Sequence, residues 1–257
     1  MSTNPYTAPA ASVADPAAAL QSIFNPGGRS VAAGRGWDWI AAGWDLFKRQ
    51  AGMWIALVLV AFVIFLVLAF IPFIGSIASV VLTPVFGAGI VLGCRAIEEG
   101  RELEIGHLFA GFKEKLAPLA AVGAIYLGST IVIVGVMVLI AGVGVFGMAA
   151  GGSGVAPAAV LTMMLGVLVA LALLVPVVMA IWFAPALVVF HDKGAVEAMK
   201  ESFTGCLRNI VPFLVYGVVM LLLSVLATIP LGLGWLVLGP VLAATLYTGY
   251  KDIYLSA

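Results

Sequence analysis

Three long runs without Asp, Glu, Lys or Arg dominate the chain, at residues 50–94, 116–191 and 209–250. One membrane-spanning helix needs about 20 apolar residues, and each run is roughly twice that length or more. Each run therefore has to reverse direction once. Residues that interrupt helices and favour turns stand near the middle of each run. They are Ile71-Pro72-Phe73-Ile74-Gly75, Gly151-Gly152-Ser153-Gly154 and Pro230-Leu231-Gly232-Leu233-Gly234.

This pattern predicts an all-α integral membrane fold with six transmembrane helices arranged as three hairpins. The predicted spans lie near 52–71, 75–94, 118–146, 157–183, 211–229 and 234–250. The residues before them, 1–33, are rich in Ala, Pro and Ser and lack apolar periodicity. We predict that 1–33 form a disordered cytoplasmic tail and that 34–257 form one membrane domain.

An amphipathic segment with helical i, i+3/i+4, i+7 spacing precedes each hairpin. The apolar stripes are Trp37, Ile40, Trp44, Phe47, Ala51 and Trp54; then Ile105, Leu108, Phe109, Phe112 and Leu116; then Val196, Met199, Phe203, Leu207 and Ile210. Helices with aromatic faces lie flat at the level of the lipid headgroups, so these segments are predicted to be interfacial. They either anchor the bundle or form a cytoplasmic collar that docks a partner or a lipid headgroup.

The three units also resemble one another in sequence. Gly43-Trp44, Gly111-Phe112 and Ser202-Phe203 occupy matching places, and Pro84 and Pro240 precede Arg95 and Lys251 by the same interval. Repeats in the same orientation imply a pseudo-threefold axis along the membrane normal.

Composition agrees with a membrane location. Hydrophobic residues make up 63% of the chain and charged residues 9%, whereas soluble domains average about 25% charged residues. A cytosolic enzyme, a nucleic-acid-binding protein and a secreted disulfide scaffold are therefore excluded. The net charge is zero, so nothing attracts the chain to nucleic acid.

The distribution of basic residues predicts the topology. All 12 Lys and Arg residues lie before the first span, between the hairpins or after the last span, and none lies in the three hairpin turns. Loops rich in Lys and Arg face the cytoplasm. We therefore expect a multi-pass membrane protein with cytoplasmic N- and C-termini.

Candidate chemistry inside the membrane is sparse. An ionisable residue within a span is a functional signal by default, and the predicted spans contain none. This weakens ion-coupled transport and intramembrane hydrolysis, and no catalytic motif or cofactor-binding motif occurs. We assign no catalytic residue and no cofactor, and the ligand-binding residues stay unknown. Small-residue pairs at Gly89/Gly93, Ala124/Gly128 and Gly239/Ala243, together with Ser, Thr and Tyr hydroxyls, are typical of helix packing.

Prolines in the returning spans suggest one hypothesis for a binding cavity. Pro84, Pro176, Pro185 and Pro240 each remove a backbone donor, and interruptions at matching repeat positions can mark a binding site. The alternative, that they are packing kinks alone, is favoured by the frequency of Pro in membrane helices.

Four potential metal ligands stand at the predicted inner boundary. Cys94, His107, His191 and Cys206 have the residue types of a tetrahedral zinc site, but their spacing matches no zinc-binding motif. We predict no metal site. The cytoplasmic side is reducing, which also disfavours a disulfide.

Two segments resemble known membrane proteins. They are Trp182 to Lys193 with Glu197-Ala198-Met199-Lys200-Glu201-Ser202-Phe203, and Arg35-Gly36-Trp37 with Gly43-Trp44-Asp45-Leu46-Phe47. Over about residues 34–254 the chain resembles an uncharacterised family of proteobacterial six-helix inner-membrane proteins. More remotely, the pattern from Pro185 to Phe203 is similar to the membrane domain of glycerophosphodiester phosphodiesterases. The resemblance implies an inner-membrane location and the repeat plan, and it carries over no catalytic residue.

These observations lead to a functional expectation. We expect a non-catalytic membrane module that binds lipid or a membrane-protein partner, with homo-oligomerisation as a further option. The alternative is a transporter or channel for a neutral or amphipathic solute, and a membrane enzyme comes third. Flux in reconstituted vesicles distinguishes the first two.

Overall fold

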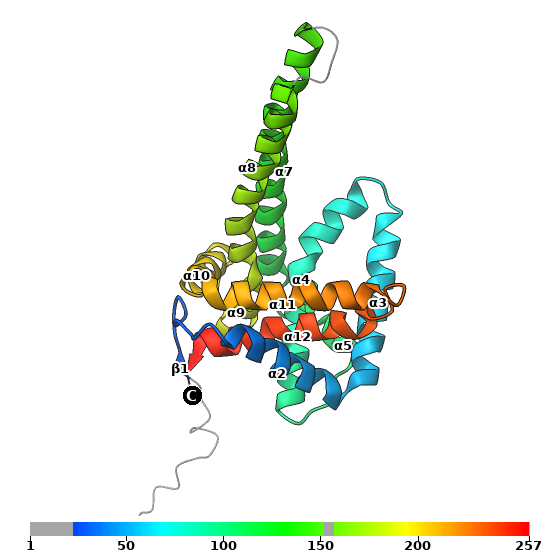
Figure 1. The fold of residues 1–257 in the computed structure, drawn as a ribbon. Coiled ribbons are helices and arrows are strands. Elements are labelled where there is room, and N and C mark those ends of the chain that lie inside the picture. Colours follow the sequence, from blue (N-terminus) through cyan, green and yellow to red (C-terminus); the bar gives the residue numbers. More distant parts are fainter. Residues whose placement is uncertain (1–22, 152–156, 257) are drawn as a thin grey trace, which may run out of the picture.

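The computed structural model describes residues 23–151 and 157–256 and is built from helical hairpins (Figure 1). The hairpins pair α3 (Ala51–Ala69) with α4 (Ile74–Glu98), α7 (Leu116–Gly151) with α8 (Pro157–Trp182), and α11 (Ile210–Thr228) with α12 (Trp235–Tyr254). In lipid, only helices and closed barrels satisfy every backbone polar group internally, so these apolar runs fold as helices.

The chain reverses at the places that Gly and Pro predicted, between α3 and α4 and between α11 and α12. Phe73 and Leu231 have positive φ angles of 59° and 56° in these turns. The turns are tight, because a Cβ on Gly75 would lie 1.8 Å from the Leu68 carbonyl oxygen. The third predicted turn, 151–154, lies almost entirely outside the described residues.

Among the described residues, five stretches are long and apolar enough to cross a membrane, so the predicted number of six spans is not confirmed. They are Ala51–Ala69, Ile74–Glu98, Leu116–Gly142, Val160–His191 and Ile210–Thr228. The predicted sixth span falls in α12, which is not among them. Polar residues occupy the last two turns of α12, and these lower its apolarity: Tyr247, Thr248, Tyr250, Lys251 and Asp252.

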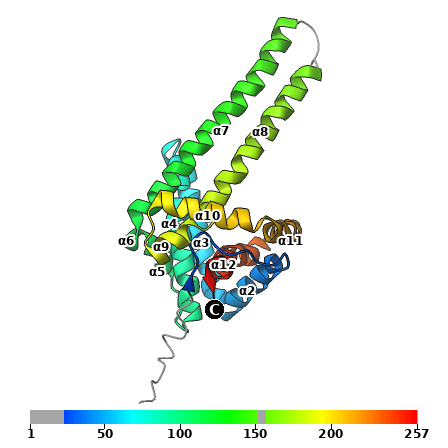
Figure 2. The same ribbon diagram turned by 90° about the vertical axis from the view of Figure 1, so that its left-hand side faces the viewer.

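The hairpins point in different directions. Helices α7 and α8 project together from the rest of the molecule, whereas α11 and α12 run transverse to them in both views (Figures 1 and 2). Helix α2 (Arg35–Arg49) lies alongside α12. The predicted arrangement of three parallel hairpins around one axis is therefore not confirmed.

The amphipathic segments form short helices, as predicted: α2, then α5 (Ile105–Leu108) with α6 (Ala110–Glu114), then α10 (Ala195–Arg208). The predicted stripe on α2 is wrong in part. Trp37 and Trp44 are exposed, and the buried face instead contains Trp39, Gly43 and Leu46. Tertiary packing selects this face because α2 lies against α11 and α12.

An additional short helix, α9 (Ala184–His191), follows α8 after a break at Phe183. The Ser202 hydroxyl causes this break by entering the backbone ladder. It accepts the Phe183 N–H at 2.9 Å and donates to the Met179 carbonyl at 2.7 Å. A polar group inserted in this way is a known cause of helix kinks, and Pro185 lies in the first turn of α9.

Residues 23–33, which the sequence placed in a disordered tail, pack on the body of the protein. Strand β1 (Ile23–Phe24) pairs antiparallel with β2 (Leu255–Ser256), and the Asn25 N–H donates to the Tyr254 carbonyl at 2.8 Å. The tail prediction is therefore wrong for these residues, because their partners lie at the other end of the chain. Residues 1–22 lie outside the described part.

The second and third amphipathic segments each pack on the returning helix of the preceding hairpin. The first segment, α2, packs on α12, the returning helix of the last hairpin. Three matching small residues mark these contacts. A Cβ on Gly111 would lie 2.3 Å from the Val85 carbonyl oxygen of α4, and one on Gly43 would lie 3.1 Å from that of Val241 in α12. Ser202 of α10 contacts α8 through its hydrogen bond to Met179.

The residue that ends each amphipathic segment also contacts the chain that leads into the next one. Gln50, Lys115 and Asn209 have similar backbone angles, with φ of −144°, −144° and −123°. The Gln50 side chain accepts the Leu103 N–H at 2.6 Å and donates to the Arg101 carbonyl at 3.1 Å.

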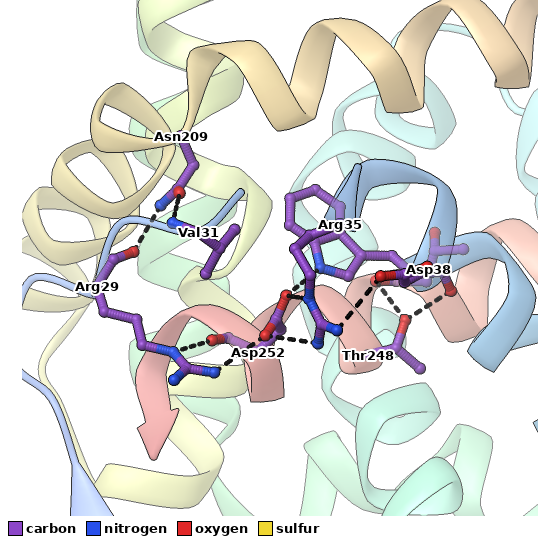
Figure 3. A network of polar contacts seen from close by, with 9 residues as sticks. Arg29, Val31, Arg35, Asp38, Asn209, Thr248 and Asp252 are labelled. Carbon is purple, nitrogen blue, oxygen red and sulfur yellow. Dashed lines mark hydrogen bonds and ion pairs between the residues drawn. The ribbon is translucent and has the colours of Figure 1, made fainter. Parts of the chain in front are cut away.

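The other two end residues make corresponding contacts. The Asn209 side chain accepts the Val31 N–H and donates to the Arg29 carbonyl, both at 2.8 Å (Figure 3). The backbone groups that Asn209 binds belong to residues 29 and 31, which are two positions apart. The groups that Gln50 binds belong to residues 101 and 103, which have the same separation. The Lys115 ammonium donates to the Asp192 carboxylate.

Candidate functional site

A polar pocket of about 440 Å³ forms where the ends of α4, α9 and α12 meet. Its lining residues are Arg95, Glu98, Glu99, Phe190, His191, Tyr247, Tyr250, Lys251 and Leu255. The position follows from the sequence pattern, because the apolar runs of these helices end here and charged residues begin. The pocket therefore lies where the helices leave the apolar layer.

Ion pairs of balanced charge line one wall of this pocket. The Lys251 ammonium lies 2.7 Å from the Glu98 carboxylate, to which the Tyr247 hydroxyl also donates at 2.8 Å. The Arg95 guanidinium donates to Glu99 at 2.8 Å. Hydrogen bonds from Arg101 and Arg95 lower the pKa of the Glu99 carboxyl. Two cations and two anions thus face the same cavity.

Aromatic rings form the other wall. The ring centroids of Phe190, Tyr247 and Tyr250 are 5.3–6.4 Å apart. His191 Nε2 and the Tyr250 hydroxyl are 2.6 Å apart, and the Phe24 ring of β1 stacks on His191 at 3.7 Å. Strand β1 therefore packs against one residue of the pocket lining.

A buried carboxylate fixes the end of α12 that carries this pocket (Figure 3). Asp252 has a side chain that is only 4% exposed. It accepts hydrogen bonds from Arg35 Nε at 2.7 Å, Trp39 Nε1 at 2.8 Å and Arg29 Nη2 at 3.1 Å. Thr248, one turn earlier, donates to the Trp39 carbonyl at 2.9 Å. These bonds join α12 to α2 and to the segment before α2.

The charge state of Asp252 follows from this cluster. Burial alone would raise the pKa of the Asp252 carboxyl, but hydrogen bonds from Arg35 and Trp39 and the nearby guanidinium charges lower it below its ordinary value. The hydrogen bond to Asp252 in turn raises the pKa of Arg35. The cluster is therefore ionised at neutral pH.

A second cavity, the apolar crevice, lies between α8, α10 and α11 and measures about 500 Å³. Its lining residues are Leu171, Leu174, Val175, Val178, Met179, Trp182, Cys206, Ile210, Phe213, Leu214, Tyr216 and Gly217. Leu171, Val175 and Leu214 are 54–62% exposed, so the crevice opens at the surface of the apolar helices. It shares no lining residue with the polar pocket.

The four potential metal ligands do not come together. Cys94 is buried in α4, Cys206 lines the crevice, and His191 lines the polar pocket. His107 Nδ1 accepts the Glu104 N–H at 3.0 Å and so caps α5. Burial raises the pKa of the Cys206 thiol to about 12, so it stays protonated at neutral pH. Across 23–151 and 157–256, no three His, Cys, Asp or Glu side chains group as a metal site.

The prolines differ in their surroundings. Pro84 and Pro240 are buried inside α4 and α12, and Pro185 lies in the first turn of α9. Only Pro176 of the four belongs to a helical turn beside the crevice, between the lining residues Val175 and Val178. Pro84 and Pro240, which occupy the matched positions, line neither cavity, so the hypothesis of a cavity beside matched kinks stays a prediction.

The small and hydroxyl residues act mainly in packing. Gly89 and Gly93 face the segment around α5, since a Cβ on Gly89 would lie 2.3 Å from the His107 carbonyl oxygen. Gly128 has open space around it. Ser79, Ser129, Thr130 and Thr228 donate to the carbonyl four residues earlier.

Sequence reasoning missed the residues of the polar pocket, although one signal pointed to them. Arg95 and Lys251 occupy matching positions after Pro84 and Pro240, and they meet in the pocket. Tyr247 and Tyr250 have helical spacing on α12. No local pattern pairs Glu98 with Lys251, because they are 153 residues apart.

Comparison with known proteins supports the membrane assignment. The chain is 28% identical over 204 residues to a probable inner membrane protein of Burkholderia thailandensis, covering 76% of this chain and 75% of the relative. With the five apolar helices, this similarity indicates a location in the inner membrane. The chain is a multi-pass membrane protein.

No family model matches the chain, and no solved structure is significantly similar to it. The resemblance to the membrane domain of glycerophosphodiester phosphodiesterases finds no support in these comparisons.

Proposed function

We propose that this protein is a non-catalytic inner-membrane module that binds a lipid molecule through the apolar crevice between α8 and α11. The crevice carries the proposal, because its volume of about 500 Å³ lies within the range of about 300–1,000 Å³ that is usual for ligand sites. Its lining is almost wholly hydrocarbon and aromatic, which suits an acyl chain. The exposed rim at Leu171 and Leu214 allows entry from the side.

Filling the crevice tests this proposal. Gly217 lines it and has nothing within 4 Å of an added Cβ, so Gly217→Phe places a ring in the cavity without a backbone clash. A ring that displaces about two methylene groups of the lipid, at about 0.8 kcal/mol each, lowers lipid retention about tenfold. The measurement is lipid per protein after detergent purification, by native mass spectrometry.

Gly128→Phe is the matched control. Gly128 is a helical glycine of another apolar span, it also has open space around it, and it lies outside the crevice. We expect this variant to retain lipid like the unaltered protein. Equal retention by both variants would contradict the crevice as the binding site. Saturable solute flux in reconstituted vesicles would favour the alternative of a transporter or channel.

In this proposal the module is built from three repeats, each of which contacts the next, so that together they form a closed ring. Each amphipathic segment packs on the preceding returning helix, and the residue that ends it contacts the chain before the next segment. The same relation joins the third unit to the first, through Asn209 and residues 29–31. The polar pocket lies where the ends of the returning segments converge, which is the position of the pseudo-threefold axis in this proposal.

Both termini lie in the cytoplasm in this proposal, and cysteine labelling tests it. The two natural cysteines are buried, so they give little background. With a membrane-impermeant maleimide, we expect Ser153→Cys to react in intact cells with a permeabilised outer membrane. Ser2→Cys should react only after the inner membrane is opened, because positively charged segments stay inside. The reverse pattern would overturn the orientation.

A further inference from the structure

We infer that the polar pocket at the ends of α4, α9 and α12 binds a zwitterionic phosphate–ammonium group of the phosphoethanolamine class. The inference is independent of the crevice, because the two cavities share no lining residue. Three features of the pocket carry it: its paired charges, its aromatic wall and its position.

The charges of the pocket match a ligand that carries both signs. Arg95 and Lys251 offer guanidinium and ammonium donors, and their side chains are 54% and 40% exposed. Glu98 and Glu99 offer carboxylates that are 31% and 42% exposed. A ligand with only a negative charge would be repelled by the two carboxylates, and a ligand with only a positive charge would be repelled by Arg95 and Lys251. A zwitterion complements both pairs.

The aromatic wall favours an ammonium group. The faces of aromatic rings attract cations within about 6 Å of the ring centroid. The protein's own cations already use this property, because Arg95 lies 5.5 Å from the Phe190 centroid and Lys251 lies 5.7 Å from that of Tyr247. When a phosphate draws Arg95 and Lys251 toward itself, a ligand ammonium takes their place between the rings and Glu98.

The position of the pocket suits either a lipid headgroup or a free molecule. Helix α4 changes from an apolar span to charged residues at Arg95, so the pocket lies at the level of the headgroups. Its volume of about 440 Å³ is sufficient for a headgroup-sized ligand.

Calorimetry on the purified full chain in detergent tests the inference. The probes are free phosphoethanolamine, ethanolamine, inorganic phosphate, dihexanoyl-phosphatidylethanolamine and dihexanoyl-phosphatidylglycerol. We expect saturable binding of the two phosphoethanolamine probes, at least about tenfold tighter than that of ethanolamine or phosphate alone. A preference for the short-chain lipid over free phosphoethanolamine assigns a lipid source, and equal affinity assigns a free one.

Variants locate the binding. We expect Glu98→Gln and Lys251→Met each to weaken phosphoethanolamine binding about tenfold or more, because each removes one charge that the ligand meets. Tyr247→Phe keeps the aromatic ring, so we expect this conservative variant to keep ammonium binding. Tyr247→Leu removes the ring, so we expect it to lose ammonium binding. Glu102→Gln and Lys113→Met change exposed charges outside the pocket and should bind normally.

Two outcomes would overturn the inference. One is the absence of saturable binding by any phosphoethanolamine probe, which would leave the pocket as an ion-paired joint between helices. The other is unchanged affinity in folded Glu98→Gln and Lys251→Met proteins. Gly217→Phe should bind free phosphoethanolamine normally, so failure of the crevice proposal stays distinguishable from failure of this one.

Discussion

Replacing Asp252 with Asn is expected to lower the free energy of unfolding by about 2–3 kcal/mol. The side chain is 4% exposed and accepts hydrogen bonds from Arg29, Arg35 and Trp39, so the variant leaves two guanidinium groups facing a neutral amide. Because Arg29 and Arg35 are about half exposed, water compensates in part, and the cost stays at the lower end for a broken buried pair.

Thermal unfolding in detergent measures this effect, and we expect the melting temperature to fall by about 5–10 °C. Asp45→Asn is the control, because Asp45 pairs with Lys48 on the surface and its side chain is 62% exposed. Surface pairs contribute about 0–1 kcal/mol, so this variant should melt almost normally. Equal melting of the two variants would contradict a structural role for the Asp252 cluster.

The same cluster predicts a pH dependence. The pKa of Asp252 in the folded protein lies below its ordinary value, which is about 3.9 in an unfolded chain. A lowered carboxyl pKa contributes stability that is present above the unfolded pKa and is lost as the pH falls through the folded pKa. The difference between the unaltered protein and Asp252→Asn should therefore be constant near neutral pH and shrink below about pH 4.

Replacing Asn209 with Ala is expected to destabilise the protein by about 2 kcal/mol. Asn209 is fully buried and holds three backbone groups, the Val31 N–H and the carbonyls of Arg29 and Gly205. Truncation leaves these groups without their side-chain partner. Because two of them belong to the segment before α2, the loss should also release that segment from the third unit.

Hydrogen exchange at the backbone amides reports this release. We expect faster exchange at residues 29–31 in Asn209→Ala and at residues 101–103 in Gln50→Ala, the corresponding variant in the first unit. Ser30→Ala changes an exposed side chain of the same segment and should behave normally. Loss of stability in Asn209→Ala without faster exchange at 29–31 would contradict the closing contact of the ring.

Much of the architecture could be predicted because local signals carry it. The turns at Pro72 and Pro230, the helices between them and the amphipathic segments follow from spacing within a few residues. The face of α2 could not be predicted in full, because Trp37, Trp39 and Trp44 all suit burial by composition. Contact with α12 selects Trp39, whose indole N–H reaches Asp252.

The uncharged runs and the helix-interrupting residues near 72 and 230 act locally, so they were enough to predict a helical membrane protein and two of its hairpin turns. The three-dimensional packing, in contrast, attaches residues 23–33 to α12 and places Glu98 and Lys251 in one pocket. It also decided that α8 and α11 enclose an apolar crevice. These features depend on contacts between residues far apart in the chain, and no local pattern encodes which distant segments will meet.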